Sequence, residues 1–267
     1  MVKISIRFTN RRFFAILAAV TSINRYQDTI MYAKVPTDAV LPAVPYDQPT
    51  LPYEKPQQGV NYWVEDDFFP EAQAKEIAKR CFNKKKWILG KPYTTQLWPG
   101  MRAKKALKTT ELQQLEDWAK EKLGKDRLWM VEGNDDVTVD SNSVHLTGAK
   151  EGGPRPHVDD RNLCRYAAVL YLSPEPKPES GTSFYRLRYD NGAPGGNIVP
   201  APYTNLVDAL KTNSLPATAW YEECQVENQF NRILLFKGNM IHGATGYFGK
   251  DKRERRLVAL YFWMAED

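Results

Sequence analysis

The sequence has little cysteine and histidine, and it lacks a hydrophobic run long enough to cross a membrane. Its 267 residues include three histidines and three cysteines. Cys81, Cys164 and Cys224 are odd in number, widely spaced and without a C-x-x-C pair, which argues against a disulfide framework or a zinc knuckle. A reducing compartment fits this cysteine usage. We therefore expect a cytoplasmic protein with no stable membrane insertion.

The N-terminus offers an alternative location. Arg7, Arg11 and Arg12 precede the apolar run 13–20, a pattern typical of the start of an export signal. The run is short, and no small-residue cleavage site follows it cleanly. Export through an N-terminal signal stays the alternative to the cytoplasm.

Neither sign of charge dominates. The formal net charge is +5, from 37 Lys and Arg against 32 Asp and Glu, and the cations form only short clusters, as at 84–86 and 253–256. The sequence has no basic stripe and no base-stacking motif, so we expect no nucleic-acid partner. A hydrophobic fraction of 42% is sufficient for a packed core. The oligomeric state is left open.

Proline usage divides the chain into an arm and a single domain. Prolines recur throughout residues 35–58, which predicts an extended segment that cannot join the interior of a sheet. We expect residues 1–58 to form an N-terminal arm, partly disordered or with a targeting role, that ends in this proline-rich linker. Residues 59–267 are expected to form the folded domain.

Two predicted helices precede a series of short strands. The first helix begins near Pro70 and runs to about Asn83, and the second has Thr110 as its N-cap and Gly124 as its stop. Strands are predicted at 62–64, 128–132, 137–139, 166–172, 233–236 and 257–263. This order predicts an α+β domain whose strands close as a sandwich or jelly roll, with helices packed outside one sheet.

The segment 189–229 is rich in Gly, Pro and Asn. It is predicted to be a long excursion between core strands, of the kind that often forms a lid or a substrate loop. Trp98, Tyr203 and Trp220 could line a pocket or simply pack in the core.

The segment His157-Val158-Asp159 predicts two metal ligands on one face. In an extended backbone alternate side chains point the same way, so the imidazole and the carboxylate lie side by side. The predicted strand 233–236 runs into a turn that ends at His242, which supplies a third ligand. Two histidines and one carboxylate form a facial triad that leaves positions open on non-haem iron. Asp160, the next residue along, is expected to point away.

Arg256 is the candidate anion anchor of the site. It opens the apolar run 257–263, so an inward guanidinium would be buried and would need an anion. A guanidinium is suited to the distal carboxylate of a dicarboxylic co-substrate, because paired hydrogen bonds fix its orientation. Strand alternation favours Arg256 over Arg255. His145, in an alternating segment, is more often a hydrogen-bonded structural histidine than a ligand.

These residues resemble the Fe(II)- and 2-oxoglutarate-dependent dioxygenases, especially the prolyl 4-hydroxylase-like group. The resemblance covers residues 60–265 in order and is specific from 154 to 263. It is carried by His157-Val158-Asp159, Val169-Leu170-Tyr171-Leu172, Gly181-Thr182-Ser183-Phe184, His242 and Arg256. One departure is that Ser180, not a second glycine, precedes Gly181.

The resemblance implies a distorted double-stranded β-helix, a cupin-like jelly roll, over residues 59–267. It implies Fe(II) held by His157, Asp159 and His242, and 2-oxoglutarate held at its distal carboxylate by Tyr171 and Arg256. The expected activity is that of an oxidoreductase: a hydroxylase that uses O2 and releases succinate and CO2. Halogenation is not expected, because related halogenases have a small residue where this chain has Asp159.

A small metabolite or an amino-acid-like molecule is the expected substrate. Two alternatives from other classes are a cupin-like metalloenzyme that does not use 2-oxoglutarate, and a non-catalytic binding protein on the same fold. The first would leave Arg256 without a role, and the second is disfavoured by the intact ligand set.

Overall fold

The computed structural model describes residues 50–266 except 90–91, 94–95, 98, 132–140, 152–155 and 213–214. The possible export signal, most of the predicted arm, Trp98 and the predicted strand at 137–139 lie outside the described residues. The boundary between arm and domain near residue 59 stays a prediction.

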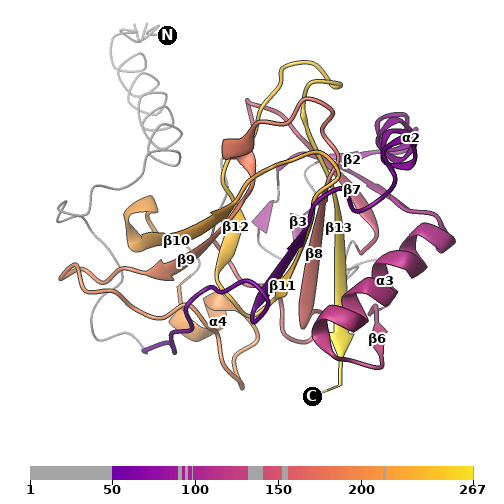
Figure 1. The fold of residues 1–267 in the computed structure, drawn as a ribbon. Coiled ribbons are helices and arrows are strands. Elements are labelled where there is room, and N and C mark those ends of the chain that lie inside the picture. The colour runs from indigo at the N-terminus through magenta and orange to yellow at the C-terminus, as the bar shows by residue number, and fades with distance from the viewer. Residues whose placement is uncertain are drawn as a thin grey trace, which may run out of the picture.

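An eight-stranded antiparallel sheet forms the centre of the fold (Figure 1). Seven strands follow one another in the order β1-β11-β8-β13-β7-β5-β2, and β6 pairs with the end of β13. The strands predicted at 62–64, 166–172, 233–236 and 257–263 are confirmed within it. Their bounds are β1 (Tyr62–Glu65), β2 (Ile88–Leu89), β5 (Met101–Lys104), β6 (Leu128–Trp129), β7 (Ser143–Thr147), β8 (Tyr166–Tyr171), β11 (Ile233–Lys237) and β13 (Arg256–Ala265).

A second, smaller sheet packs against one face of the first. It has the order β10-β9-β12, with β9 (Thr182–Leu187), β10 (Trp220–Val226) and β12 (His242–Ala244). Phe184 of β9 and Val226 of β10 share an apolar cluster with Val169 and Val258 of the large sheet. The space between the two sheets is therefore a packed interior. A separate pair joins β3 (Pro92–Tyr93) to β4 (Gln96–Leu97).

Two helices cover the other face of the large sheet, as Figure 1 shows. They are α2 (Glu71–Phe82) and α3 (Thr109–Leu123). Strand alternation explains the two layers: Ala168 and Leu170 of β8 pack under the helices, whereas Val169 and Tyr171 face the small sheet. The predicted arrangement, antiparallel strands with helices on one sheet, is confirmed at this level. The short helices are η1 (Pro178–Ser180), α4 (Leu206–Leu210) and η2 (Ala217–Ala219).

The predicted end of the second helix is confirmed, but its predicted start is wrong. Gly124 follows α3 in the left-handed conformation, with φ of 60°. The N-cap is Lys108, not Thr110. The Glu111 side chain accepts a hydrogen bond from the Lys108 N–H at 2.7 Å. A carboxylate in the first turn satisfies the free N–H group, so the helix begins before the threonine.

The prediction of one long excursion from 189 to 229 is wrong in its last third. Residues 220–226 form strand β10, and Trp220 is buried in an apolar cluster instead of lining a pocket. Only the two ends of β10, Trp220 and Val226, are buried, and the residues between them are partly or fully exposed on this edge strand. No apolar alternation therefore marked the strand among the surrounding Pro and Asn.

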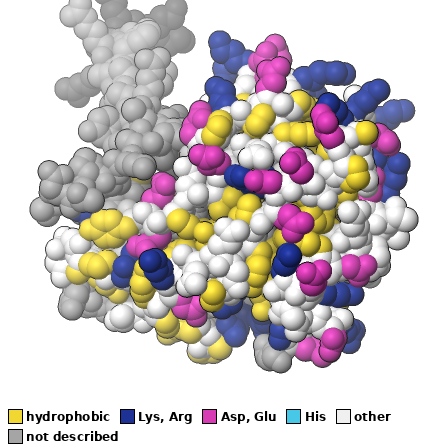
Figure 2. Space-filling model, viewed as in Figure 1, with side chains coloured by type: hydrophobic (Ala, Val, Ile, Leu, Met, Phe, Trp, Pro, Cys, Tyr) yellow, Lys and Arg dark blue, Asp and Glu magenta, His cyan; other side chains and the backbone are white. Residues whose placement is uncertain are grey.

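The surface carries both signs of charge. On the face shown in Figure 2, acidic and basic side chains are interspersed and separated by small apolar patches. Among the described residues, no helix combines the length and the apolar character that a bilayer span requires.

Candidate metal centre

Two backbone segments meet where the predicted ligands lie. His157 and His242 exchange backbone hydrogen bonds, N–H to O=C, at 2.8 Å in each direction. The Asp159 N–H donates to the Gly238 carbonyl, also at 2.8 Å. The segment 157–159 thus runs antiparallel to the residues that lead into β12. Ligands far apart in the sequence are held together by main-chain bonds, which do not depend on a metal.

The three side chains converge on one point. One ligand atom from each of His157, Asp159 and His242 lies within 4.8 Å of the others. His242 Nε2 is 3.8 Å from Asp159 Oδ2, and the two imidazole ring centroids are 4.5 Å apart. Neither His145 nor Asp160 belongs to this group. The structure therefore brings the predicted trio together.

Hydrogen bonding and burial set the ligands in the state that a metal needs. His242 Nδ1 lies 2.8 Å from the Met240 carbonyl, a contact that requires a proton on Nδ1 and leaves the Nε2 lone pair free for a cation. Burial lowers the pKa of His242 to about 4, so this imidazole is neutral near neutral pH. Burial raises the pKa of Asp159 to about 6, opposed by the charge of His157. The carboxylate is still ionised near neutral pH.

Close packing fixes the Asp159 carboxylate. The Cys164 Sγ lies 3.7 Å from Asp159 Oδ2, and a Cβ placed on Gly238 would lie 3.2 Å from the same oxygen. The Phe236 ring packs on the His242 ring with centroids 4.4 Å apart. Sequence reasoning missed Cys164 and Gly238. The only available signal was the Lys237-Gly238-Asn239 turn, because the contact between residues 164 and 238 depends on tertiary packing.

The residues that alternate with the ligands form the back of the site. Val158 lies between His157 and Asp159, and Ile241 precedes His242, and both side chains point into a buried apolar cluster. Its other members include Leu51, Val199 and Trp220. The segment after residue 189, predicted to be a lid, thus packs partly behind the ligand segments.

Asn197 connects residues 51–54 to the segment that contains His242. This asparagine is fully buried, and its side chain accepts from the Glu54 N–H at 2.8 Å and donates to the Glu54 carbonyl at 2.7 Å. The Asn197 carbonyl in turn accepts from the Ile241 N–H at 2.8 Å. The end of the proline-rich segment is therefore connected, through one residue, to the neighbour of His242.

Arg256 is buried between the sheets, and its hydrogen bonds to described residues go to backbone carbonyls. Its exposed fraction is 4%, and it lies on the same face of β13 as Val258. Its Nε donates to the Ser180 carbonyl at 2.8 Å and its Nη2 to the Gly181 carbonyl at 3.2 Å. Within the described part of the chain, no carboxylate forms an ion pair with it. Burial lowers the pKa of Arg256, yet its intrinsic value is so high that it stays charged.

Tyr171 lies beside this guanidinium. The Arg256 guanidinium carbon is 5.7 Å from the centroid of the Tyr171 ring, and the Tyr171 hydroxyl donates to Thr182 Oγ1 at 2.8 Å. Tyr171 is fully buried. The two residues that the resemblance assigns to the distal carboxylate of 2-oxoglutarate are therefore neighbours. Ser180, the departure from the glycine pair, provides one of the two carbonyls that hold Arg256.

The alternative residues make other contacts. Arg255 pairs with Glu151, with 3.2 Å between Nη1 and Oε1. His145 accepts from Arg102 Nε at 3.3 Å and lies 3.0 Å from the Ser143 hydroxyl. Asp160 Oδ1 accepts from the Asn162 N–H at 2.9 Å. The contacts of His145 match the structural role expected for it.

The chain belongs to a protein family whose members have no assigned function. Residues 57–259 match the model of a family described as "Family of unknown function (DUF6445)". A search of curated proteins found no match.

Several solved structures have a similar course of the chain, each at low identity. The carbocyclase SnoK of nogalamycin biosynthesis, described as non-heme and alpha-ketoglutarate dependent, is 12% identical, with 78% of this chain and 81% of that chain covered and a TM-score of 0.47. HygX from Streptomyces hygroscopicus, solved with nickel, 2-oxoglutarate and hygromycin B, is 13% identical, with coverages of 77% and 83% and a TM-score of 0.46. A prolyl-4-hydroxylase from Pseudomonas putida is 13% identical, with coverages of 77% and 93% and a TM-score of 0.42. Likenesses of this extent do not determine function, which must be inferred from the site itself.

Proposed function

We propose that this protein is an Fe(II)- and 2-oxoglutarate-dependent oxygenase on a distorted double-stranded β-helix. The observation that carries the proposal is the convergence of two imidazoles and one carboxylate within 4.8 Å, at a site where His242 is buried and His157 and Asp159 are half-buried. Facing sheets with ligands from a loop and from the small sheet are consistent with that fold.

The donor set fits a non-haem iron. Two neutral imidazole nitrogens and one carboxylate oxygen match the facial triad of iron oxygenases, and the imidazole that donates to Met240 is already held in the ligating tautomer. The trio contains no cysteine, and the neighbouring thiol of Cys164 contacts the carboxylate, so the set does not match a thiolate zinc site. His157, Asp159 and His242 would hold the metal.

Arg256 fits the distal carboxylate of 2-oxoglutarate. A charged guanidinium with 4% exposure and no acidic partner among the described residues is costly, and a bound carboxylate would offset that cost. The two carbonyls of Ser180 and Gly181 hold the guanidinium in place. Tyr171 would donate its hydroxyl to the same carboxylate, turning from Thr182 or sharing it.

The remaining chemistry follows from what the chain would bind. Together Fe(II), 2-oxoglutarate and O2 supply an oxidation that releases succinate and CO2 and inserts oxygen into a C–H bond. The protein would orient the co-substrate and the substrate, and it would exclude water. Phe184, Phe236 and Val258 form apolar walls beside the ligands. Retention of Asp159 favours hydroxylation, and we propose a small metabolite or an amino-acid-like molecule as substrate.

The test is a spectroscopic one with a matched pair of variants. Under anaerobic conditions Fe(II) and 2-oxoglutarate should together give the weak visible charge-transfer band of the chelate, and candidate substrates should then stimulate succinate release in air. Arg256→Ala should weaken 2-oxoglutarate binding by at least about tenfold, since a buried charged hydrogen-bonding partner is lost. Arg255→Ala, its neighbour, should leave the band in place.

Other outcomes would identify the alternatives. Iron binding without a band would indicate a metalloenzyme that does not use 2-oxoglutarate. Absence of both iron binding and the band would leave a binding protein. Loss of the band in Arg255→Ala but not in Arg256→Ala would show that the anchor had been assigned to the wrong arginine.

A further inference from the structure

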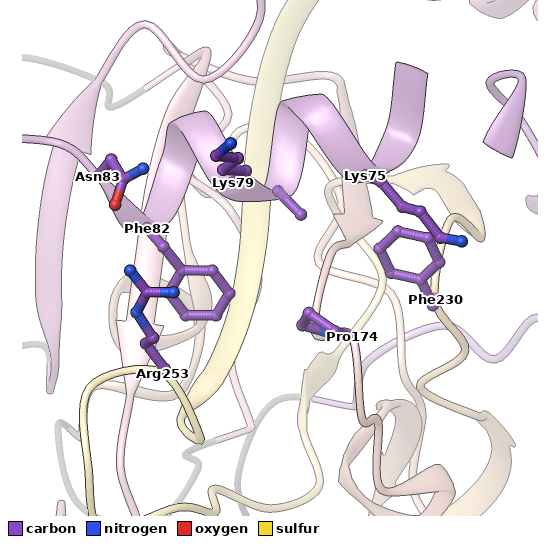
Figure 3. A pocket seen from close by; sticks show the side chains of 8 residues that line it. Lys75, Lys79, Phe82, Asn83, Pro174, Phe230 and Arg253 are labelled. Atoms are coloured by element: carbon purple, nitrogen blue, oxygen red, sulfur yellow. The ribbon is translucent and has the colours of Figure 1, made fainter. Parts of the chain in front are cut away.

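A second cavity lies on the opposite side of the large sheet from the metal centre. It has a volume of about 380 Å³ and is formed between α2 and the segments that flank β8, β11 and β13 (Figure 3). Its apolar lining consists of Ala78, Phe82, Pro174 and Phe230. In the view of Figure 3 the two phenyl rings flank Pro174 below the helix. The volume falls within the range of small-molecule sites.

The charged groups that line this cavity are all cations. They are Lys75, Lys79 and Arg253, and no Asp or Glu lines it. Lys75 already has a partner, since its Nζ is 2.6 Å from Glu71. For Lys79 and Arg253 no ion pair is found among the described residues. Two cations are thus available beside an apolar surface.

This combination defines the chemistry of a ligand. The phenyl rings and the proline favour a flat apolar group, and a guanidinium favours a carboxylate because it can form two parallel hydrogen bonds. We propose that the cavity binds a small carboxylate that carries an aromatic ring, with the ring between Phe82 and Phe230 and the carboxylate on Arg253 and Lys79. The site does not depend on the function proposed for the metal centre.

The position of the cavity separates it from the iron site. Pro174 lies after the end of β8, Phe230 before β11 and Arg253 before β13, and Phe82 and Phe230 belong to the cluster under the helices. The metal ligands lie on the other face, next to the cluster between the sheets. Occupation of this cavity therefore requires neither metal nor co-substrate.

Isothermal titration with phenylacetate tests the proposal on the full chain, with acetate and phenylacetamide as probes that lack the ring or the charge. Phenylacetate should bind in the millimolar range, and each of the other two should bind at least about fivefold more weakly. Arg253→Ala should weaken phenylacetate binding by about fivefold, because one of two charged contacts is removed. Lys250→Ala, an exposed cation on the same loop and outside the cavity, should not change it.

A second variant, Phe230→Ala, removes one ring and should weaken phenylacetate while leaving acetate unchanged. If that variant unfolds, Arg253→Ala still decides, because its side chain is exposed on a loop. The proposal is overturned if phenylacetate gives no heat of binding up to about 20 mM. It is also overturned if phenylacetamide binds as tightly as the acid, or if Lys250→Ala weakens binding as much as Arg253→Ala.

Discussion

At the scale of single residues, Gly238 controls the space around Asp159, a proposed metal ligand. An added Cβ would lie 3.2 Å from Asp159 Oδ2 and 3.1 Å from Cys164 Sγ, closer than nearly all real Cβ contacts. We expect Gly238→Ala to lower metal affinity by about tenfold, because displaced outer contacts of a ligand typically cost that much. Anaerobic titration with Fe(II), or with Co(II) as a spectroscopic substitute, measures it.

A double variant is the control for this prediction. Removing the sulfur in Gly238→Ala/Cys164→Ala should recover part of the lost affinity, because the new methyl group gains the space that Sγ occupied. Equal metal affinity in Gly238→Ala and the unmodified chain would show that Asp159 has more freedom than its contacts indicate.

The cysteines give a prediction on pH. Burial raises the pKa of Cys81 to about 12 and the pKa of Cys164 well above its usual range. Burial also raises the pKa of Cys224, although this residue is only half-buried. A raised thiol pKa means less thiolate at a given pH, so reaction with an alkylating reagent should be slow at about pH 8 and should accelerate as pH rises. Mass spectrometry of native protein should find Cys224 modified first. Faster labelling of Cys164 would mean that the metal centre opens readily.

Residue patterns in the sequence were sufficient to predict that the three candidate side chains come together, but not what surrounds them. Alternation placed His157 and Asp159 on one face and Arg256 on the inner face of β13, and both placements are found in the structure. Alternation is a local property, so it can be read from neighbours in the chain. Gly238 and Cys164 come together only through the pairing of β8 with β11, which no local pattern contains.

At the scale of elements, residues 51–54 act as an additional strand-like edge. The Pro52 carbonyl accepts from the N–H groups of Asn197 and Ile198 at 2.9 and 3.1 Å, and Asn197 bonds to Glu54 in both directions. The proline-rich composition predicted an extended segment over residues 35–58, of which the structure describes residues 50–58. It could not predict the docking, which depends on the buried amide of a residue about 140 positions later.

We expect Asn197→Ala to reduce the free energy of unfolding by about 1–3 kcal/mol, because two part-buried hydrogen bonds from a buried amide to the Glu54 backbone are lost. Chemical denaturation measures this loss. Gln113→Ala, which removes an exposed amide from α3, should change stability by less than about 0.5 kcal/mol.

The same contacts bear on the predicted domain boundary. A chain that begins at residue 59 lacks the partner of Asn197, so it should be less stable than one that begins at residue 50, by a similar amount. Equal denaturation midpoints of the two truncated chains would show that residues 50–58 add nothing to the domain.

At the scale of the whole molecule, the metal centre joins the two apolar clusters beside the small sheet. Val158 and Ile241 point into one cluster, and His242 packs on Phe236, a member of the other. A metal that holds 157–159 to 242 should therefore stabilise the complete fold. At a free metal concentration about 100 times the dissociation constant, linkage gives about 2.7 kcal/mol.

For a domain of this size that gain corresponds to a rise in Tm of roughly 5–10 °C, measured by anaerobic calorimetry with Fe(II) against a chelator. His242→Ala should abolish the rise, whereas Lys211→Ala, an exposed cation distant from the ligands in sequence, should preserve it. A metal-induced shift that survives in His242→Ala would place the metal elsewhere.

The overall class of fold could be predicted because two helices precede strands of period two. Which strands form the second sheet could not be predicted, since β9, β10 and β12 pair across long intervals of sequence. For β10, the run of mostly exposed residues between Trp220 and Val226 lacks an apolar alternation, and this made a strand look like a loop. These strands form through pairing with distant residues, and local composition does not indicate that pairing.

The last strand, β13, occupies the middle of the large sheet, with β8 on one side and β7 on the other. During synthesis on the ribosome, everything before residue 256 therefore emerges as two half-sheets with unpaired edges and no joining strand. The protein cannot complete its sheet, or bury Arg256, until β13 has been synthesised. A nascent chain stalled before residue 256 would expose unpaired strand edges and be prone to aggregation or chaperone binding.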